Sequence, residues 1–216
     1  MKLGVLGTGM VGETIGTKLV QLGHDVKMGS RTATNDSAAA WTKKNGSHAS
    51  HGTFADAAAF GEMIFNCTHG VASLEALKGA GEKNINGKIL VDVANALDFS
   101  KGMPPLLAFC NTDSLGEQIQ RAFPRAKVVK ALNTLNCSLM VTPEILGKGD
   151  HDIFICGNDA AAKSAVTNLL RDGFGWKTII DLGDITASRA TEMLLPIWLR
   201  LMGTFKTPQF NFKIVR

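Results

Sequence analysis

The 216-residue sequence lacks the motifs of several common classes of active site. It contains no GxSxG nucleophile elbow, no HExxH zinc motif and no Walker phosphate loop. Its four cysteines, at positions 67, 110, 137 and 156, include no CxxC pair, so neither a zinc site nor a thioredoxin-like motif is indicated. Apolar or small residues surround each cysteine, which favours reduced thiols in or near a core. We therefore expect no metal site.

Long hydrophobic runs and targeting segments are also missing. The most apolar stretch, residues 193–205 (MLLPIWLRLMGTF), is shorter than the ~20 residues of a membrane span and contains Pro196 and Arg200. Residues 1–6 are too short for a signal peptide. The net charge of +4 is spread along the chain, without the basic stripe of a nucleic-acid-binding protein. We expect a cytoplasmic protein that binds neither membrane nor nucleic acid.

What the sequence does contain is an alternation of short apolar segments and longer amphipathic ones. The predicted strands are 2–7, 24–29, 62–68, 88–95, 126–133, 151–157 and 177–183, and the predicted helices are 10–23, 36–45, 54–60, 113–122, 159–172 and one long helix over 184–205. Strands that are apolar throughout are buried on both faces. The pattern predicts the α/β class: a Rossmann-type doubly wound, mainly parallel sheet with a small C-terminal helical extension. Right-handed crossovers place the ligand crevice at the carboxyl ends of the strands.

We expect a single domain over residues 1–216, in which 184–216 is a C-terminal helix and tail extension, because no polar linker divides the chain. Two segments leave alternatives open. The loop 99–114, with Pro104 and Pro105, either lies over the crevice or is a plain surface connection. The tail FKTPQFNFKIVR (205–216) is either an edge strand or a dimer contact.

The first strand runs into a GxGxxG motif, formed by Gly7, Thr8, Gly9, Met10, Val11 and Gly12. Its position between a strand and a helix makes the motif specific for a dinucleotide. The first glycine permits the tight turn, the second lets the backbone approach a pyrophosphate, and the third lets helix and strand pack closely. The helix start then offers free N–H donors to the phosphates.

The end of the second strand lacks the carboxylate that commonly holds the adenosine ribose of NAD. The sequence there reads Ser30, Arg31, Thr32, and Asp25 stands too far away, at the start of the strand. A guanidinium attracts a 2′-phosphate and donates two parallel hydrogen bonds, and the hydroxyls add neutral donors. The motif therefore favours NADP(H) over NAD(H), with a solvated surface arginine as the alternative.

Later strand ends supply polar residues that would lie near the nicotinamide. The predicted cofactor-binding residues there are Cys67, Thr68, His69, Asn95, Ala131 and Asn133. An Asn amide can orient a carboxamide or a carbonyl, although it also suits simple turn capping. His69 is the one candidate for acid–base catalysis, and a loop histidine without chemistry is the alternative. No acid–base dyad is visible, and direct hydride transfer needs mainly alignment of the reactants.

Six segments together resemble the F420-dependent NADP oxidoreductase family, which includes the cytosolic reductase domain of the STEAP metalloreductases. They are GVLGTGMVGETIGTKLVQLGHDVKMGSR (4–31), TFADAAAFGEMIF (53–65), ILVDVANAL (89–97), AFPRAKVVKALNT (122–134), DIFICGNDAAAKSAVTNLL (152–170) and IIDLGDITASRATEMLLPIW (179–198). The first is common among Rossmann proteins, whereas VVKALNT and DLGDITASRATE are more specific.

The resemblance implies hydride transfer between NADPH and a flavin-like acceptor, coenzyme F420 or FMN/FAD, with the nicotinamide against the acceptor ring. It implies that Ser30 and Arg31 bind the 2′-phosphate, and that the protein is a homodimer whose C-terminal helical region contributes to the acceptor side. Some members of the family carry a second basic residue shortly after the Ser-Arg pair, which residues 33–36 of this sequence lack. Neutralisation of the 2′-phosphate would therefore depend on Arg31. The competing hypothesis is a non-catalytic NADP(H)-binding sensor, in which side chains of the loop 99–112 fill the crevice.

Overall fold

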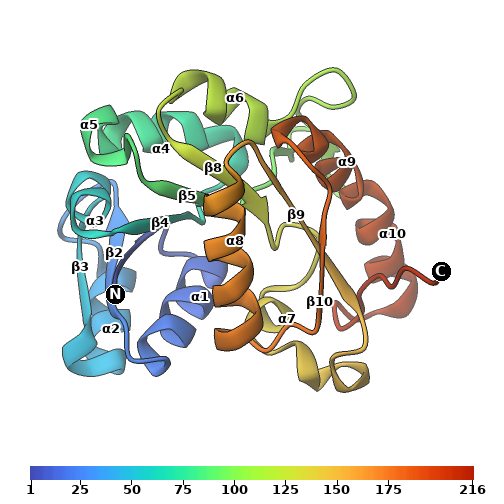
Figure 1. Cartoon of the computed structure of the whole chain (residues 1–216), viewed down its shortest axis with the longest axis horizontal. Coiled ribbons are helices and arrows are strands. Elements are labelled where there is room, and N and C mark those ends of the chain that lie inside the picture. The colour runs from blue at the N-terminus through green and yellow to red at the C-terminus, as the bar shows by residue number, and fades with distance from the viewer.

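A computed structural model describes all 216 residues as an eight-stranded sheet with helices on both faces (Figure 1). The strand order is β10-β9-β8-β5-β4-β1-β2-β3. The strands are β1 (Lys2–Leu6), β2 (Asp25–Ser30), β3 (Ala49–Thr53), β4 (Met63–Asn66), β5 (Ile89–Asp92), β8 (Lys127–Ala131), β9 (Asp152–Gly157) and β10 (Thr178–Asp181). From β3 to β8 all neighbours are parallel, which confirms the predicted Rossmann-type sheet.

The helices cover the two faces of the sheet in two groups. They are α1 (Met10–Gln21), α2 (Asp36–Asn45), α3 (Phe54–Phe60), α4 (Ser73–Ala80), α5 (Glu82–Ile85), α6 (Leu115–Ala122), α7 (Cys137–Val141), α8 (Ala160–Asn168), α9 (Ser188–Met193) and α10 (Leu195–Phe205). Buried side chains of α1, α2, α7 and α8 form one core with the sheet, and those of α3 to α6 form the other. Both faces are thus covered, which explains why the central strands are apolar throughout.

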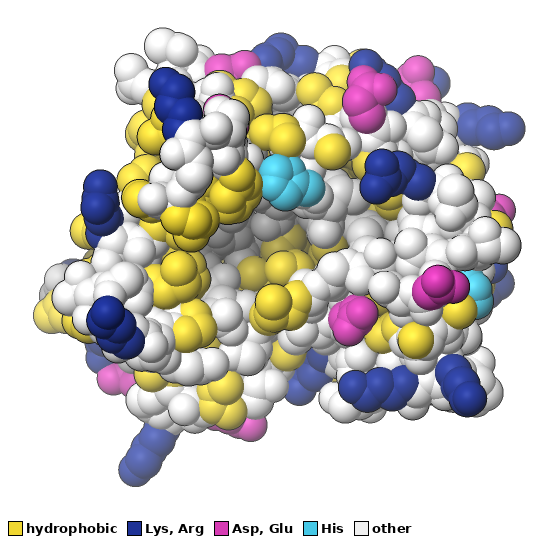
Figure 2. Space-filling view, turned by 180° about the vertical axis from the view of Figure 1, so that it is seen from behind, with side chains coloured by type: hydrophobic (Ala, Val, Ile, Leu, Met, Phe, Trp, Pro, Cys, Tyr) yellow, Lys and Arg dark blue, Asp and Glu magenta, His cyan; other side chains and the backbone are white.

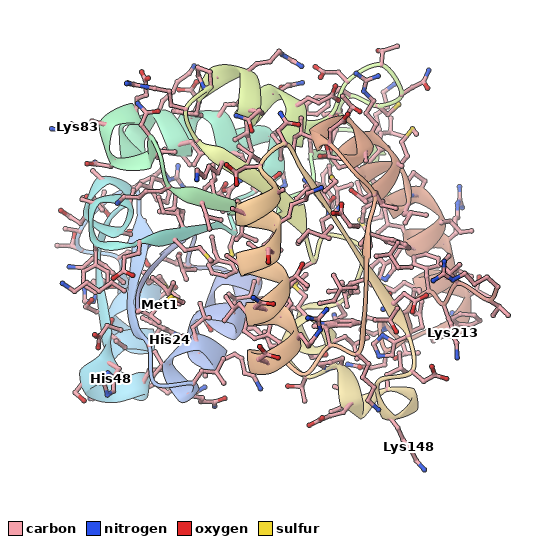
Figure 3. All side chains as sticks on the ribbon, viewed as in Figure 1. Met1, His24, His48, Lys83, Lys148 and Lys213 are labelled. Atoms are coloured by element: carbon pink, nitrogen blue, oxygen red, sulfur yellow. The ribbon has the colours of Figure 1, made fainter.

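The amino ends of the first three strands lie at one edge of the molecule. Met1, His24 and His48 immediately precede β1, β2 and β3, and Figure 3 shows them close together. The side chain of Asp25 hydrogen-bonds His48 at this edge, with 2.8 Å between the carboxylate oxygen and Nδ1. Asp25 therefore lies at the opposite end of β2 from the predicted cofactor site, as expected.

Several elements differ from the sequence prediction. The single helix expected over 184–205 is wrong: a 3₁₀ turn (Ile185–Ala187), α9 and α10 replace it. Pro196 lies in the first turn of α10, where its missing N–H costs nothing, so it starts a new helix instead of continuing the previous one. The tail forms no strand, although Asp152 N donates to Phe212 O (3.0 Å).

Three further features were not predicted. The edge strand β3 has the polar sequence ASHGT and pairs only with β2. Strand β9 runs antiparallel to β8, and β10 runs parallel to β9, so both point away from the carboxyl edge of the other six. The loop after β5 contains a small hairpin of β6 (Leu97–Asp98) and β7 (Leu106–Leu107).

No helix is both long enough and apolar enough to cross a lipid bilayer.

Candidate functional site

The carboxyl ends of β1, β4, β5 and β8 meet at a cavity of about 430 Å³. Figure 2 shows a hollow on the far side of the molecule, with hydrophobic side chains gathered around it. The cavity is lined by Gly9, Met10, Val11, Cys67, Thr68, His69, Gly70, Val93, Ala94, Asn95, Leu97, Phe99, Asn133, Leu135, Asn136, Cys137, Met140, Leu195 and Trp198. No Asp, Glu, Lys or Arg is among them, so the site is an apolar space with neutral polar groups at the strand ends.

The glycine motif forms one end of this cavity. Gly7 adopts a φ of +117°, and a Cβ at this position would lie 2.6 Å from the carbonyl oxygen of Cys67. A Cβ at Gly12 would lie 2.1 Å from the carbonyl oxygen of Gly7, whereas a Cβ at Gly9 would meet nothing within 4 Å. The outer two glycines are therefore required by packing. Gly9 instead leaves open space in front of the helix.

That open space lies at the start of α1, where backbone donors are free. Gly9 is the N-cap and provides no side chain, and the first intrahelical bond runs from Glu13 N to Gly9 O (2.9 Å). The N–H groups of the first helical turn have no partner within the helix. Together with the helix dipole they suit an anion, so this loop fits the pyrophosphate of a dinucleotide.

The end of β2 lies next to the glycine loop, because Gly7 N donates to Gly29 O (2.9 Å). Arg31 is exposed and makes no ion pair, so its guanidinium is free for a ligand. The Ser30 hydroxyl is mostly buried and donates to Thr32 O (2.5 Å). Ser30 thus shapes the turn, and Arg31 is the group that fits a 2′-phosphate.

The end of β4 contributes three of the predicted residues. Thr68 donates its hydroxyl to Asn66 Oδ1 (2.7 Å), which fixes its side chain at the wall. Burial, and next the charge of Asp92, raise the pKa of the Cys67 thiol, so Cys67 is not a thiolate nucleophile. His69 is exposed, and its ring lies 5.9 Å from that of Phe99, centroid to centroid.

Two asparagines join the ends of β5 and β8. Asn95 Nδ2 donates to Asn133 O (2.7 Å), and Asn133 Nδ2 donates to Asn95 Oδ1 (3.0 Å). Both residues line the cavity, as expected for groups that orient a carboxamide. Ala131, also predicted as a cofactor residue, is fully buried inside β8 and does not line the cavity. Its side chain belongs to the core, because it precedes the point at which the strand leaves the sheet.

The loop 99–112 leaves the cavity open. Of its residues only Phe99 is among the lining side chains. Met103 is 68% exposed and Leu106 50% exposed, so neither fills the space. An open cavity beside the dinucleotide loop is the arrangement expected of an enzyme with a second substrate, and it disfavours the filled crevice of a sensor.

The individual residues of one wall of the cavity were not singled out from the sequence. They are Leu135, Asn136, Cys137 and Met140 around the start of α7, and Leu195 and Trp198 on α10. The family resemblance implied a contribution from the C-terminal helical region, but which of its residues reach the cavity depends on how the chain returns to the sheet. No three His, Cys, Asp or Glu side chains are grouped so as to hold a metal ion.

Comparison with known proteins agrees with this geometry. The profile of the family described as NADP oxidoreductase, coenzyme F420-dependent, matches residues 2–96. The chain is 29% identical over 160 residues to the F420-dependent NADP reductase of Methanocaldococcus jannaschii, which covers 74% of this chain and 70% of that protein. It is 30% identical over 212 residues to the metalloreductase STEAP3 of Rattus norvegicus, over 96% of this chain but only 38% of that protein.

Solved structures extend the similarity to the whole chain. A crystal structure of a candidate F420-dependent NADP reductase from Arthrobacter sp. FB24 matches with a TM-score of 0.95 and 53% identity, over 100% of both chains. A reductive aminase from Aspergillus terreus, solved with NADPH and ethyl-5-oxohexanoate, shares the fold at a TM-score of 0.66 and 16% identity, over 95% of this chain and 62% of that one.

Proposed function

Since the chain belongs to the F420-dependent NADP oxidoreductase family and is an NADP-dependent oxidoreductase, we propose that it transfers hydride between NADP(H) and a flavin-like acceptor such as coenzyme F420. The observation that supports a flavin-like acceptor is the open cavity beside the glycine loop, whose lining includes no Asp, Glu, Lys or Arg. Its size and apolar walls suit a planar ring placed against a nicotinamide.

We assign the predicted cofactor residues to three parts of NADP(H). Gly7, Thr8, Gly9, Met10, Val11 and Gly12 would hold the pyrophosphate; Ser30, Arg31 and Thr32 the 2′-phosphate; and Cys67, Thr68, His69, Asn95 and Asn133 the nicotinamide end. Free helix N–H groups, an unpaired guanidinium and fixed amides support these three assignments. Residues 1–216 would act as one NADP-binding domain, with 184–216 as its helix and tail extension.

The chain's contribution to the reaction is orientation of the two reactants. When bound, NADPH supplies the hydride. The apolar walls would exclude water once both rings fill the cavity, and the Asn95–Asn133 pair fixes the polar groups at the strand ends. His69 lines the cavity and is also exposed to solvent. We propose His69 as the group that donates the proton accompanying reduction of the acceptor.

The C-terminal helix also supports the expected homodimer. In α10 only Leu195 is buried, while Ile197 is 51% exposed and Phe205 53% exposed. An apolar helix with this exposure suits burial against a second copy of the chain. Sedimentation equilibrium of the wild type and of Ile197→Lys tests this: we expect a dimer that the lysine weakens, and a monomeric wild type contradicts it.

A panel of acceptors tests the function. Purified protein is mixed with NADPH and with F420, FMN, FAD or a quinone, and the absorbance of both partners is followed. We expect NADPH to be oxidised with a flavin-like acceptor, and NADH to be a much poorer donor. If NADPH binds but none of these acceptors is reduced, the proposal of a flavin-like acceptor is wrong.

A further inference from the structure

A buried ionic cluster lies behind the cavity wall, centred on Lys130 of β8. The side chain of Lys130 is fully buried, and its ammonium group is 2.8 Å from Asp92 Oδ2, 2.6 Å from Ala94 O and 2.8 Å from Glu192 Oε1. Two of these three partners lie at the end of β5 and the third lies on α9, so the ammonium group contacts both segments at once. The cluster therefore fixes the relative position of β8, the end of β5 and α9.

The start of helix α6 balances the excess negative charge of the cluster, which has one lysine and two carboxylates. Burial alone would lower the pKa of Lys130, but Asp92 and Glu192 together raise it above its usual value, so the lysine stays charged. The carboxylate of Glu192 also accepts two hydrogen bonds from the start of α6. Leu115 N donates to Glu192 Oε2 (2.9 Å), and Gly116 N donates to Glu192 Oε1 (3.2 Å). The positive end of the α6 dipole thus compensates the excess negative charge.

On one side the cluster reaches the cofactor half of the cavity. Ala94, whose carbonyl oxygen accepts from Lys130, lines the cavity and directly precedes Asn95. Asn66 Nδ2 donates to Asp92 Oδ1 (2.8 Å), and Asn66 Oδ1 accepts from Thr68, another lining residue. Lys130 and Asp92 therefore hold the strand ends that face the nicotinamide in the proposed function.

On the other side the cluster reaches the wall formed by α10. Glu192 lies at the end of α9, and the lining residues Leu195 and Trp198 follow it within two helical turns. Because Leu195 is the only buried residue of α10, few contacts of α10 itself hold this helix to the sheet. Glu192 ties this segment to both β8 and α6, and the ion pair between Arg189 and Glu117 adds a second charged link from α9 to α6.

We propose that Lys130 and Glu192 are positioning residues that hold Leu195 and Trp198 opposite the strand ends and so set the gap that the acceptor ring enters. The ion pair suits this task because its hydrogen bonds are directional, whereas apolar contacts allow a helix to slide. The inference rests on the proposed function for the identity of the ligand, but the placement of α10 can be measured without it.

The test uses Glu192→Gln, which keeps the size of the side chain but puts an amide donor where the backbone N–H groups of α6 need an acceptor. The protein is labelled with 5-fluorotryptophan, and the Trp198 resonance is assigned with Trp198→Phe. We expect this resonance to shift in Glu192→Gln while that of Trp41, on α2, does not. We also expect the KM for the acceptor to rise about tenfold, with the Kd for NADPH unchanged.

The matched control is Glu75→Gln, the same chemical change in a solvent-exposed ion pair with Lys78 on α4. It should move neither the Trp198 resonance nor the acceptor KM. A folded Glu192→Gln protein with an unchanged Trp198 resonance overturns the inference, whatever the acceptor assays give. If Glu192→Gln does not fold, Glu192→Asp, which keeps the charge on a shorter side chain, is judged by the same two criteria. A wild type that reduces no acceptor contradicts the proposed function alone, because the Trp198 resonance and the NADPH Kd are measured without an acceptor.

Discussion

Asn95 and Asn133 hydrogen-bond each other in both directions across the ends of β5 and β8, through one backbone carbonyl and one side-chain carbonyl. The two residues are 38 positions apart in the sequence, yet each fixes the other's orientation at the wall of the cavity. This pairing orients the polar surface at this wall of the cavity. It also means that a change at either asparagine affects both.

Replacement of Asn133 by alanine should therefore reduce turnover as well as stability. Asn95 Oδ1 loses its donor, and the free energy of unfolding should fall by about 1 kcal/mol. We expect kcat to fall about tenfold because the amide of Asn95 then keeps only its hydrogen bond to the backbone carbonyl of residue 133 and is held less firmly. The control is Asn45→Ala, which removes a comparable hydrogen bond to Trp41 O on α2. It should lose similar stability at full kcat; equal kcat for both variants would contradict a role in orientation.

The glycine motif offers a matched pair of substitutions. A methyl group at Gly9 meets no protein atom within 4 Å, and the φ of −84° suits alanine, so Gly9→Ala should fold normally. It should raise the Kd for NADPH about 10- to 100-fold, because the methyl group occupies the space in front of the helix N–H groups. Fluorescence titration with NADPH and thermal unfolding together check this.

Gly12→Ala should behave in the opposite way. Its Cβ would lie 2.1 Å from the backbone carbonyl oxygen of Gly7, so the backbone must move. We expect a loss of at least about 1–3 kcal/mol in the free energy of unfolding. Normal stability for Gly12→Ala, or unchanged NADPH affinity for Gly9→Ala, would contradict the roles assigned to these glycines.

Arg31→Ala tests the preference for the phosphorylated cofactor. Because Arg31 is exposed and has no ion pair, its removal should leave the fold intact. The Kd for NADPH should rise about 10- to 100-fold, while that for NADH should not change, since only NADPH carries the 2′-phosphate. Arg125→Ala is the control, because Arg125 precedes β8 and so lies at the opposite edge of the sheet. Parallel losses for both cofactors would rule out a phosphate site at Arg31.

The buried carboxylate of Glu117 predicts a pH-dependent contribution to stability. Hydrogen bonds from Arg189 foremost, and also from Ser114, lower the pKa of Glu117. A lowered carboxyl pKa stabilises the folded state above the unfolded value of about 4.3, and this contribution is lost as the pH falls through the folded pKa. Glu117→Gln should therefore cost about 1–3 kcal/mol at pH 7.

The difference in unfolding free energy between wild type and Glu117→Gln should shrink as the pH falls below about 4. The wild-type carboxyl group then becomes protonated and loses its charge, as the amide of glutamine has none. Urea unfolding of wild type and Glu117→Gln at several pH values measures this difference. A difference that stays constant down to the lowest pH would show that the charge of Glu117 does not contribute.

The sequence pointed to the parts of the candidate site that depend on local patterns. Gly7 to Gly12 were singled out because a strand, a glycine turn and a helix follow each other directly in the chain, and Arg31 because it follows the second strand. Asn95 and Asn133 were singled out because parallel strands bring their carboxyl ends to one edge, and both line the cavity. The contacts of these residues with NADP(H) stay predictions.

The resemblance pointed to the C-terminal helical region, but Leu195 and Trp198 could not be singled out, since they reach the cavity only through tertiary contacts. The chain arrives at α10 after two strands, β9 and β10, whose reversed direction was not predicted. Periodicity also gave one helix over 184–205, whereas Pro196 divides it. Strand β3 was missed because it is a polar edge strand that pairs only with β2.

The contact between Glu192 and Leu115 has a consequence for how the protein folds. The glycine loop needs only β1, α1 and β2, which are consecutive in the chain, whereas Glu192 must meet Leu115 across 77 residues. Contacts of long sequence separation carry a larger entropic cost and slow folding. The glycine loop can therefore form from a short N-terminal segment, whereas the cavity wall that contains Leu195 and Trp198 forms only when the last helices of the chain dock.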